Sequence, residues 1–148
     1  MDAKVKFQML RGNKSEEDKK KDPPIIVNLV EGNFAPVYSQ GRCGNCYAYA
    51  QVDGLNIHNL VKKRNIPRLS IQQLTDCSSD PNLMPHNWGC DGGLFHISNI
   101  FMLKTGLNSM MAYPFNIETI TEGTNAKCSE VKKKEPTFKI SYWHDIWT

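Results

Sequence analysis

The residues in this sequence whose types and spacing could do chemistry are its cysteines. There are five of them in 148 residues. Two form a C-x-x-C pattern and the others follow at wide intervals: Cys43, Cys46, Cys77, Cys90 and Cys128. Cysteines in such patterns bind zinc, act as a redox dithiol, or form structural disulfides. The sequence therefore leaves three arrangements open: a zinc site, a redox dithiol, or two disulfides with one free thiol.

Each arrangement makes a different demand on the chain. A tetrahedral zinc site needs two further ligands, usually a second close pair, and Cys77 and Cys90 are too far apart to form one. Cys43 and Cys46 could be a redox dithiol, because such a pair opens a helix, but three cysteines then have no role. Two disulfides and one free thiol account for all five cysteines and indicate an oxidising compartment.

Cys46 is the candidate for the free thiol. It lies where the sequence predicts the main helix, residues 46–64, to begin. The unpaired N–H groups of a helix N-terminus carry partial positive charge, which favours the thiolate form of a cysteine. Gly41 and Gly44 on the upstream side leave the sulfur approachable. We therefore expect Cys46 to be a nucleophile.

The main helix is predicted from its apolar positions and its ends. Ala48, Val52 and Leu55 recur at helical spacing, and neighbouring apolar residues widen this face, so we expect the helix to be largely buried. Asn45 precedes it as a favoured N-cap residue. The basic residues 62–64 fall in the expected last turn, where cations suit the helix dipole.

Local signals predict the other elements. Ser70-Ile-Gln-Gln73 is a capping box that opens a short helix to about Cys77. A third helix is predicted over residues 94–105, with Gly106 as its stop. The remaining predicted segments are a disordered charged tail over residues 1–22, a short strand over 25–30, a polar loop over 78–89, an irregular segment over 107–130 and a strand over 138–142.

Composition narrows the possible function classes. Hydrophobic residues make up 40% of the chain and the formal net charge is +3, which lacks the basic excess typical of a nucleic-acid binder. No apolar run approaches the length of about 18 residues that a membrane span needs. Residues 1–10 show no secretory signal. We therefore expect one globular domain with no nucleic-acid or membrane partner.

Four motifs, in order along the chain, resemble those of the papain-like cysteine proteases, which include the cathepsins. Cys43-Gly-Asn-Cys-Tyr47, preceded by Gln40, resembles the family's Cys-Gly-Ser-Cys-Trp segment. The segment Leu69-Ser-Ile-Gln-Gln-Leu-Thr-Asp-Cys77 resembles the family's L-S-x-Q-x-L-x-D-C. The other two are Gly89-Cys-Asp-Gly-Gly-Leu94, which resembles G-C-x-G-G, and the set Gly106-Leu107, Tyr113-Pro114-Phe115 and Cys128, which resembles G-L…Y-P-Y…C.

The resemblance implies a fold class and a domain division. The family's α+β fold has a helical left domain and a β-barrel domain, with the substrate cleft between them. By this resemblance residues 23–130 would form the helical half-domain. Residues 131–148 would begin the second, β domain and stop before it is complete.

The resemblance also implies roles for single residues. Cys46 would be the nucleophile, and Gln40 the side-chain donor of the oxyanion hole beside the backbone N–H of Cys46. The residues lining the substrate cleft would be Gly44, Tyr47, Gly92, Gly93 and Phe95, with Phe95 shaping an apolar specificity pocket. The implied disulfides are Cys43–Cys90 and Cys77–Cys128. No metal and no cofactor is expected.

Partners and location follow from the same resemblance. It implies a peptide or protein substrate, with protease inhibitors or a complementary C-terminal half as further partners. It implies the lysosome, the vacuole or the extracellular space as the location.

Departures from the family pattern decide the activity that we expect. Asn45 and Tyr47 replace the usual Ser and Trp. The family's base His and its orienting Asn lie about 130–150 residues beyond the nucleophile, whereas the sequence ends at Thr148. The local histidines are His58, His86, His96 and His144, and only His144, beside Asp145, is worth testing as a base.

We therefore expect an incomplete cysteine peptidase chain with negligible activity by itself. One alternative is a non-catalytic relative that binds peptides or inhibitors. The other is a thiol redox or zinc module on Cys43 and Cys46.

Overall fold

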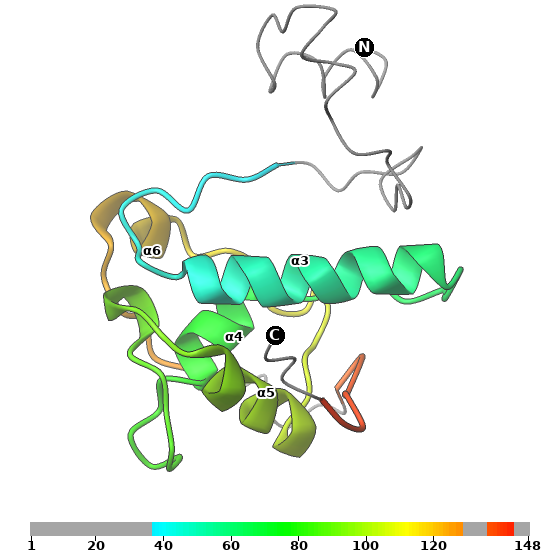
Figure 1. The fold of residues 1–148 in the computed structure, drawn as a ribbon. Helices are drawn as coiled ribbons and strands as arrows, with labels where there is room; N and C mark the ends of the chain where they lie inside the picture. Colours follow the sequence, from blue (N-terminus) through cyan, green and yellow to red (C-terminus); the bar gives the residue numbers. More distant parts are fainter. Residues whose placement is uncertain (1–36, 129–135, 144–148) are drawn as a thin grey trace, which may run out of the picture. The chain divides into compact units, whose positions relative to one another are not determined.

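The structure is a computed structural model that describes residues 37–128 and 136–143 (Figure 1). Over these residues the elements follow in the order α3, α4, the short 3₁₀ helix η1, α5 and α6. The predicted tail over 1–22, the predicted strand over 25–30 and His144 lie outside the described residues. Within the described part of the chain, no helix has the length and apolar character needed to cross a lipid bilayer.

Helix α3, Cys46–Val61, begins at the residue that the sequence predicts. Its buried residues are Tyr47, Ala48, Val52, Asn56 and Asn59. The exposed residues at a spacing of four are Cys46, Ala50, Gly54 and His58. One side of the helix therefore lies at the surface, and the expectation of a largely buried helix is wrong.

Both ends of α3 differ in detail from the prediction. Asn45 occupies the N-cap position, but its side chain makes no capping hydrogen bond. Its Nδ2 instead donates to Thr75 Oγ1 at 3.0 Å in the interior. The helix ends at Val61 rather than Arg64, because Lys63 adopts a left-handed φ of 51° that interrupts the helix.

Helix α4, Ile71–Cys77, begins at the predicted capping box. Ser70 Oγ accepts a hydrogen bond from Gln73 N at 3.0 Å, which confirms the cap. The reciprocal half of the box is not formed, because Gln73 Oε1 accepts from Asn108 N at 2.6 Å instead. Every residue of α4 is buried, so its polar side chains find partners in neighbouring segments of the protein.

Helix η1, Gly89–Asp91, and helix α5, Phe95–Lys104, come next along the chain. Helix α5 confirms the predicted third helix, and Gly106 follows its C-cap residue Thr105 with a φ of 78°. The predicted polar loop over 78–89 connects α4 to η1.

The side chain of Asn87 fastens this loop to its surroundings. Its Nδ2 donates to Ser78 Oγ and to Ser98 Oγ, both at 2.9 Å. Its Oδ1 accepts from Leu94 N at 2.8 Å, just before α5. Because Asn87 is fully buried, these bonds connect the end of α4 and the start of α5 without exposure to water.

Helix α6, Ile117–Glu122, lies within a segment that the sequence predicts to be irregular, so that part of the prediction is wrong. Asn116 caps the helix, since its Oδ1 accepts from Glu118 N at 2.9 Å. Gly123 ends it in the left-handed conformation with a φ of 69°.

A buried polar network joins α6 and the preceding loop to α4. Gln72 Nε2 donates to Thr119 Oγ1 at 3.2 Å, and Gln72 Oε1 accepts from Asn116 N at 3.2 Å. Gln72 Nε2 also donates to Asp76 Oδ1 at 2.8 Å, and Tyr113 OH donates to Asp76 Oδ2 at 2.8 Å. Tertiary hydrogen bonds therefore stabilise α6, which explains why its own sequence pattern does not predict it.

The predicted strand over residues 138–142 is wrong. Phe138 forms an isolated antiparallel bridge with Leu107, in which their backbone N–H groups donate to each other's carbonyls at 3.0 and 2.8 Å. Across residues 37–128 and 136–143, pairing goes no further than isolated bridges. Phe138 and Ile140 pack against the core, so core contacts and one isolated bridge hold this segment in place of a strand.

One hydrophobic core lies between α3, α4 and α5, which Figure 1 shows side by side. Helix α3 contributes Tyr47, Ala48 and Val52, and α4 contributes Leu74 and Cys77. The other buried members are Leu69, Ile71, Phe101, Met102, Leu107 and Tyr113. This core fixes the N-terminal end of α3, where the candidate nucleophile lies.

Candidate active site

Cys46 is the first residue of α3 and the one free cysteine of the five. Its side chain is exposed. No side-chain hydrogen bond caps the start of α3, and Ala48 N already donates to Asn45 O at 2.9 Å, so the N–H groups of Cys46 and Tyr47 are the donors that the first turn offers to an anion. The structure therefore presents an unbridged sulfur at a helix N-terminus, as the sequence predicts.

The other four cysteines form two disulfides. Cys43 pairs with Cys90 and Cys77 pairs with Cys128, which is the pairing that the resemblance implies. Cys43 is therefore not available for a redox dithiol with Cys46. Among residues 37–128 and 136–143, no group of three or more His, Cys, Asp or Glu side chains could bind a metal ion.

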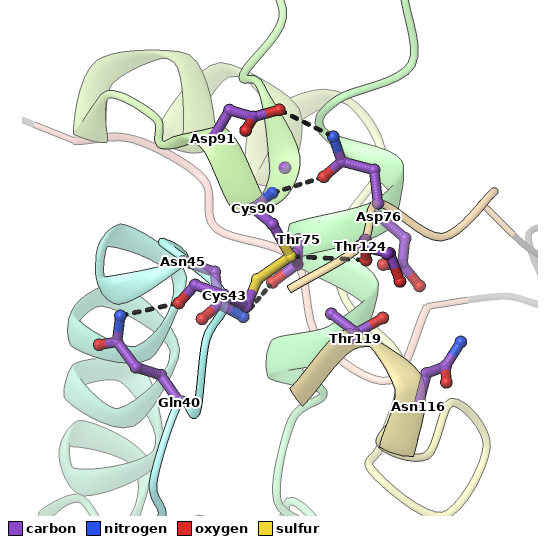
Figure 2. The surroundings of a disulfide bond; sticks show 12 residues. Gln40, Cys43, Asn45, Thr75, Asp76, Cys90, Asp91, Asn116, Thr119 and Thr124 are labelled. Carbon is purple, nitrogen blue, oxygen red and sulfur yellow. Dashed lines mark hydrogen bonds between the residues drawn. A yellow bond between two sulfur atoms is a disulfide. The ribbon is translucent and has the colours of Figure 1, made fainter. Parts of the chain in front are cut away.

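A tight turn precedes Cys46 and carries Gln40. Cys43 N donates to Gln40 O at 3.3 Å across the turn. Gln40 Nε2 donates to Cys43 O at 2.8 Å, which Figure 2 marks with a dashed line. One of the two amide hydrogens of Gln40 is thus used inside the turn, and the other remains to donate elsewhere.

The Cys43–Cys90 disulfide brings a second segment, residues 89–93, beside this turn (Figure 2). Gly44 N donates to Cys90 O at 2.8 Å, and a Cβ on Gly44 would lie 2.5 Å from that oxygen. Gly92 faces open space, because no atom lies within 4 Å of where its Cβ would be. The structure thus brings together Gly44 and Gly92, two of the predicted cleft residues.

Tyr47 lies beneath this surface rather than on it. Its side chain is buried, and its OH donates to Gly89 O at 3.3 Å. A Cβ on Gly93 would lie 2.8 Å from the Tyr47 ring and 2.7 Å from Asn87 Oδ1. The structure therefore does not place the Tyr47 side chain on the surface with the other predicted cleft residues, and its ring packs under Gly93.

Burial also sets the ionisation of this tyrosine. Burial raises the pKa of Tyr47 to about 12, although a hydrogen bond with Ser78 opposes the shift. The phenol therefore stays neutral near pH 7 and does not act as an acid or base beside Cys46.

Large apolar side chains are exposed in the segment that contains Gly92 and Gly93. Phe95, predicted to shape a pocket, is 55% exposed, and Trp88 is 50% exposed. Leu94 is also exposed, and Trp88 N donates to Gly92 O at 3.0 Å. The sequence interpretation overlooks Trp88, although it stands directly before the Gly-Cys-Asp-Gly-Gly motif.

None of the histidines in the described residues is hydrogen-bonded to Cys46. His58 lies on α3, roughly 18 Å along the axis from Cys46 at 1.5 Å per residue. His86 Nδ1 lies 2.8 Å from Asn87 O, and His96 is exposed on α5. Within the described residues, the candidate site therefore combines a free, exposed thiol with hydrogen-bond donors and has no imidazole hydrogen-bonded to the sulfur.

Comparison with known proteins decides the family. The family model for papain family cysteine proteases matches residues 26–147. The chain belongs to the papain family of cysteine proteases. The described residues correspond to the helical left domain of that fold.

Curated relatives from plants share this family. Cysteine proteinase COT44 of Brassica napus is 30% identical over 125 residues, which cover 83% of this chain and 35% of that protein. The KDEL-tailed cysteine endopeptidase CEP2 of Arabidopsis thaliana is 31% identical over 141 residues, 92% of this chain and 36% of that protein. The chain thus spans about a third of the length of these papain-family relatives.

Two solved papain-family structures are similar over most of the chain. The proform of the ragweed pollen allergen Amb a 11, a cysteine protease, has a TM-score of 0.54 and 32% identity, covering 72% of this chain and 29% of that one. The Carica candamarcensis cysteine protease CMS1MS2, in complex with E-64, has a TM-score of 0.55 and 26% identity, covering 72% and 45%.

Proposed function

We propose that this chain supplies the nucleophile and the oxyanion donors of a papain-type cysteine peptidase. The observation that carries the proposal is the state of Cys46. It is free and exposed at the N-terminus of α3, while the other four cysteines are paired. Membership of the papain family supports the reaction class.

In the proposed reaction, Cys46 Sγ attacks the carbonyl carbon of a peptide bond. The carbonyl oxygen then carries negative charge, which N–H donors must stabilise. The backbone N–H of Cys46, at the open helix N-terminus, is one donor. The amide hydrogen of Gln40 that is not bonded to Cys43 O is the second.

The proposed mechanism needs a base that takes the thiol proton. A helix N-terminus alone stabilises a negative charge by only about 0.3–1 kcal/mol. We propose that a histidine and an orienting asparagine from a complementary C-terminal half supply the rest. By itself the chain is then expected to have negligible peptidase activity.

An extended peptide is the proposed substrate. A Cβ at Gly92 would meet open space, so an extended peptide can approach this residue and pair with the chain as an added strand does. Exposed Phe95, Leu94 and Trp88 beside it favour an apolar side chain near the scissile bond. Since a papain-family relative has been solved in complex with E-64, we propose that inhibitors of this kind bind the same surface.

The two disulfides favour an oxidising location for the folded chain. With the family membership, they support the lysosome, the vacuole or the extracellular space.

The test uses the refolded chain alone and together with the C-terminal half of a papain-family relative, with a fluorogenic Phe-Arg peptide as substrate. We expect hydrolysis that requires both halves, stops on addition of E-64 and is absent in Cys46→Ala. Gly54→Ala, on the same helix in open space, is the matched control and should behave as the parent chain. Hydrolysis that persists in Cys46→Ala would refute the proposal that Cys46 is the nucleophile. Peptide binding by both halves without any hydrolysis would favour the non-catalytic alternative.

A further inference from the structure

The turn that carries Gln40 lies directly against the end of α6. Gly41, the residue after Gln40, has a φ of 62°. Arg42 N donates to Ile120 O at 2.9 Å. Ile120 belongs to the last turn of α6, where Gly123 N donates to Thr119 O at 3.1 Å and Arg42 N donates to the next carbonyl, that of Ile120. A backbone donor of the turn and a backbone acceptor of the helix therefore satisfy each other.

Two glycines make this approach of two backbones possible. A Cβ on Gly41 would overlap the carbonyl of Ile120. A Cβ on Gly123 would lie 2.7 Å from Arg42 O and 3.1 Å from its carbonyl carbon. Both glycines have positive φ, 62° and 69°, a conformation that glycine adopts without steric cost. A side chain at either position would push the turn and α6 apart.

Helix α6 is itself fixed to the interior of the protein. The buried side chain of Gln72 on α4 bonds to Thr119 Oγ1 and to Asn116 N, both at 3.2 Å. Thr119 is fully buried. The contact therefore connects the Gln40 turn to α4 through a helix that cannot shift freely.

We propose that the C-terminal end of α6 positions the oxyanion donor Gln40, with Gly123 as the positioning residue. This inference rests on the proposed function, because it assumes that Gln40 donates to the oxyanion. A donor must lie within about 0.5 Å of its productive position. Displacement of Arg42 would move the neighbouring Gln40 and Cys43, whose mutual bonds define the turn.

Two reagents that react with the Cys46 sulfur distinguish the effect of the oxyanion donors on its reaction rate from the effect of its exposure to solvent. With p-nitrophenyl acetate, the Cys46 thiolate forms an S–C bond at the ester carbonyl through a tetrahedral oxyanion. The C–O bond then breaks and p-nitrophenolate leaves with the electron pair. With iodoacetamide, the S–C bond forms as the C–I bond breaks and iodide leaves, with no oxyanion. The ratio of the two rates therefore reports on the oxyanion donors.

The variant Gly123→Asn tests the contact in the full chain. Asparagine tolerates the left-handed conformation but adds a Cβ against Arg42 O. Gly106→Asn is a matched control, because Gly106 also follows a helix with positive φ, 78°, and its Cβ would lie 2.8 Å from Phe138 O. The rates measured with Cys46→Ala are subtracted from the ester and alkylation rates of each variant. Mass spectrometry identifies the residue that carries the acetyl group.

Loss of one oxyanion donor lowers enzymatic rates by a factor of about 10²–10³, and we expect a smaller loss in this chain without its base. Gln40→Ala should lower the ratio of ester to alkylation rates by about tenfold and Gly123→Asn by at least about threefold. Gly106→Asn should leave the ratio unchanged even where it lowers thermal stability.

The outcomes separate this inference from the proposed function. An unchanged ratio in Gln40→Ala would refute the oxyanion role itself. A lowered ratio in Gln40→Ala with an unchanged ratio in Gly123→Asn would overturn only the positioning role. If Gly123→Asn does not fold, Thr119→Val removes the bond from Gln72 while keeping the side-chain shape. A lowered ratio in that variant supports the positioning role, and an unchanged ratio overturns it.

Discussion

The nucleophile turn, residues 40–46, and the buried segment around α4, residues 70–78, are stabilised in opposite ways. Gly41, Arg42 and Cys46 of the turn are exposed. Backbone bonds from Gly44 N to Cys90 O and from Arg42 N to Ile120 O fix the turn, and Gly41 and Gly44 allow these close approaches because they carry no Cβ. The α4 segment is fully buried, and the polar side chains of Gln72 and Asp76 bond it to Thr119 of α6 and to Tyr113. Each region also carries one disulfide.

Because of this difference, we expect the turn to control the reactivity of Cys46 and the α4 segment to control the stability of the fold. In the turn, the side chains of Gln40 and Cys46 are not needed to fill the core, so we expect substitutions there to change chemistry more than folding. Around α4, an unpaired buried polar group costs about 1–3 kcal/mol, so we expect substitutions there to change folding more than chemistry.

The largest expected effect comes from removing each disulfide by a paired Cys→Ala change. The bridges span sequence separations of 47 and 51 residues, so the chain-entropy relation gives a similar loss of about 4 kcal/mol for each. Only loss of Cys43–Cys90 should also alter the alkylation rate of Cys46. Denaturant titration and timed iodoacetamide labelling measure the two quantities. Equal effects of both bridges on labelling would contradict the comparison.

The second prediction concerns the buried carboxyl group of Asp76. Burial raises its pKa from 3.8 to about 6, against the opposing hydrogen bonds from Tyr113 and Gln72. The folded chain thus keeps a proton that the unfolded chain loses. The contribution of this group to stability is therefore present below about pH 4 and is lost as the pH rises to about 6.

The expected loss in the free energy of unfolding is on the order of 2 kcal/mol across that window. Asp76→Asn should flatten this part of the pH profile of urea unfolding. The parent and variant are compared at pH 4, 5, 6 and 7. A parent profile that rises between pH 4 and 6, with no change in Asp76→Asn, would show that burial does not control this group.

The cap of α4 gives a smaller effect. Ser70 Oγ accepts from Gln73 N and donates to Tyr113 O at 2.7 Å. Ser70→Ala should lower the free energy of unfolding by about 1–2 kcal/mol, measured by denaturant titration, and should leave the Cys46 alkylation rate unchanged. A slower alkylation rate at equal stability would place Ser70 in the reactive region and contradict the division.

The smallest effect is expected at Gly54 on the exposed side of α3. A Cβ there meets no atom within 4 Å. Gly54→Ala should raise the free energy of unfolding by up to about 1 kcal/mol, because alanine favours the helix. Thermal unfolding measures the gain. A loss of stability would show that this face of α3 is covered in solution.

Local signals in the sequence predict the elements that they can specify alone. The start of α3 at Cys46, the Ser70 cap of α4 and the α5 stop near Gly106 are confirmed. The last two depend on the chemistry of residues close in sequence, a capping hydroxyl at Ser70 and a left-handed glycine at position 106.

The elements that the sequence misses depend on distant residues. Helix α6 depends on bonds from the distant residue Gln72, and Phe138 pairs with Leu107 in place of a strand neighbour. Asn45 has the right residue type for a cap, but the nearby Thr75 hydroxyl binds its side chain. For the candidate site, the free sulfur was predictable from the sequence, whereas the close approach of Gly123 to the backbone of Arg42 was not.

The central claim is that Cys46 alone is unbridged and accessible. Peptide mapping by mass spectrometry tests it most directly, after iodoacetamide labelling of the native, unreduced chain. We predict one label per chain, at Cys46, with Cys43–Cys90 and Cys77–Cys128 recovered as linked peptides. Recovery of Cys46 in a disulfide, or a label at any other cysteine, would contradict the account.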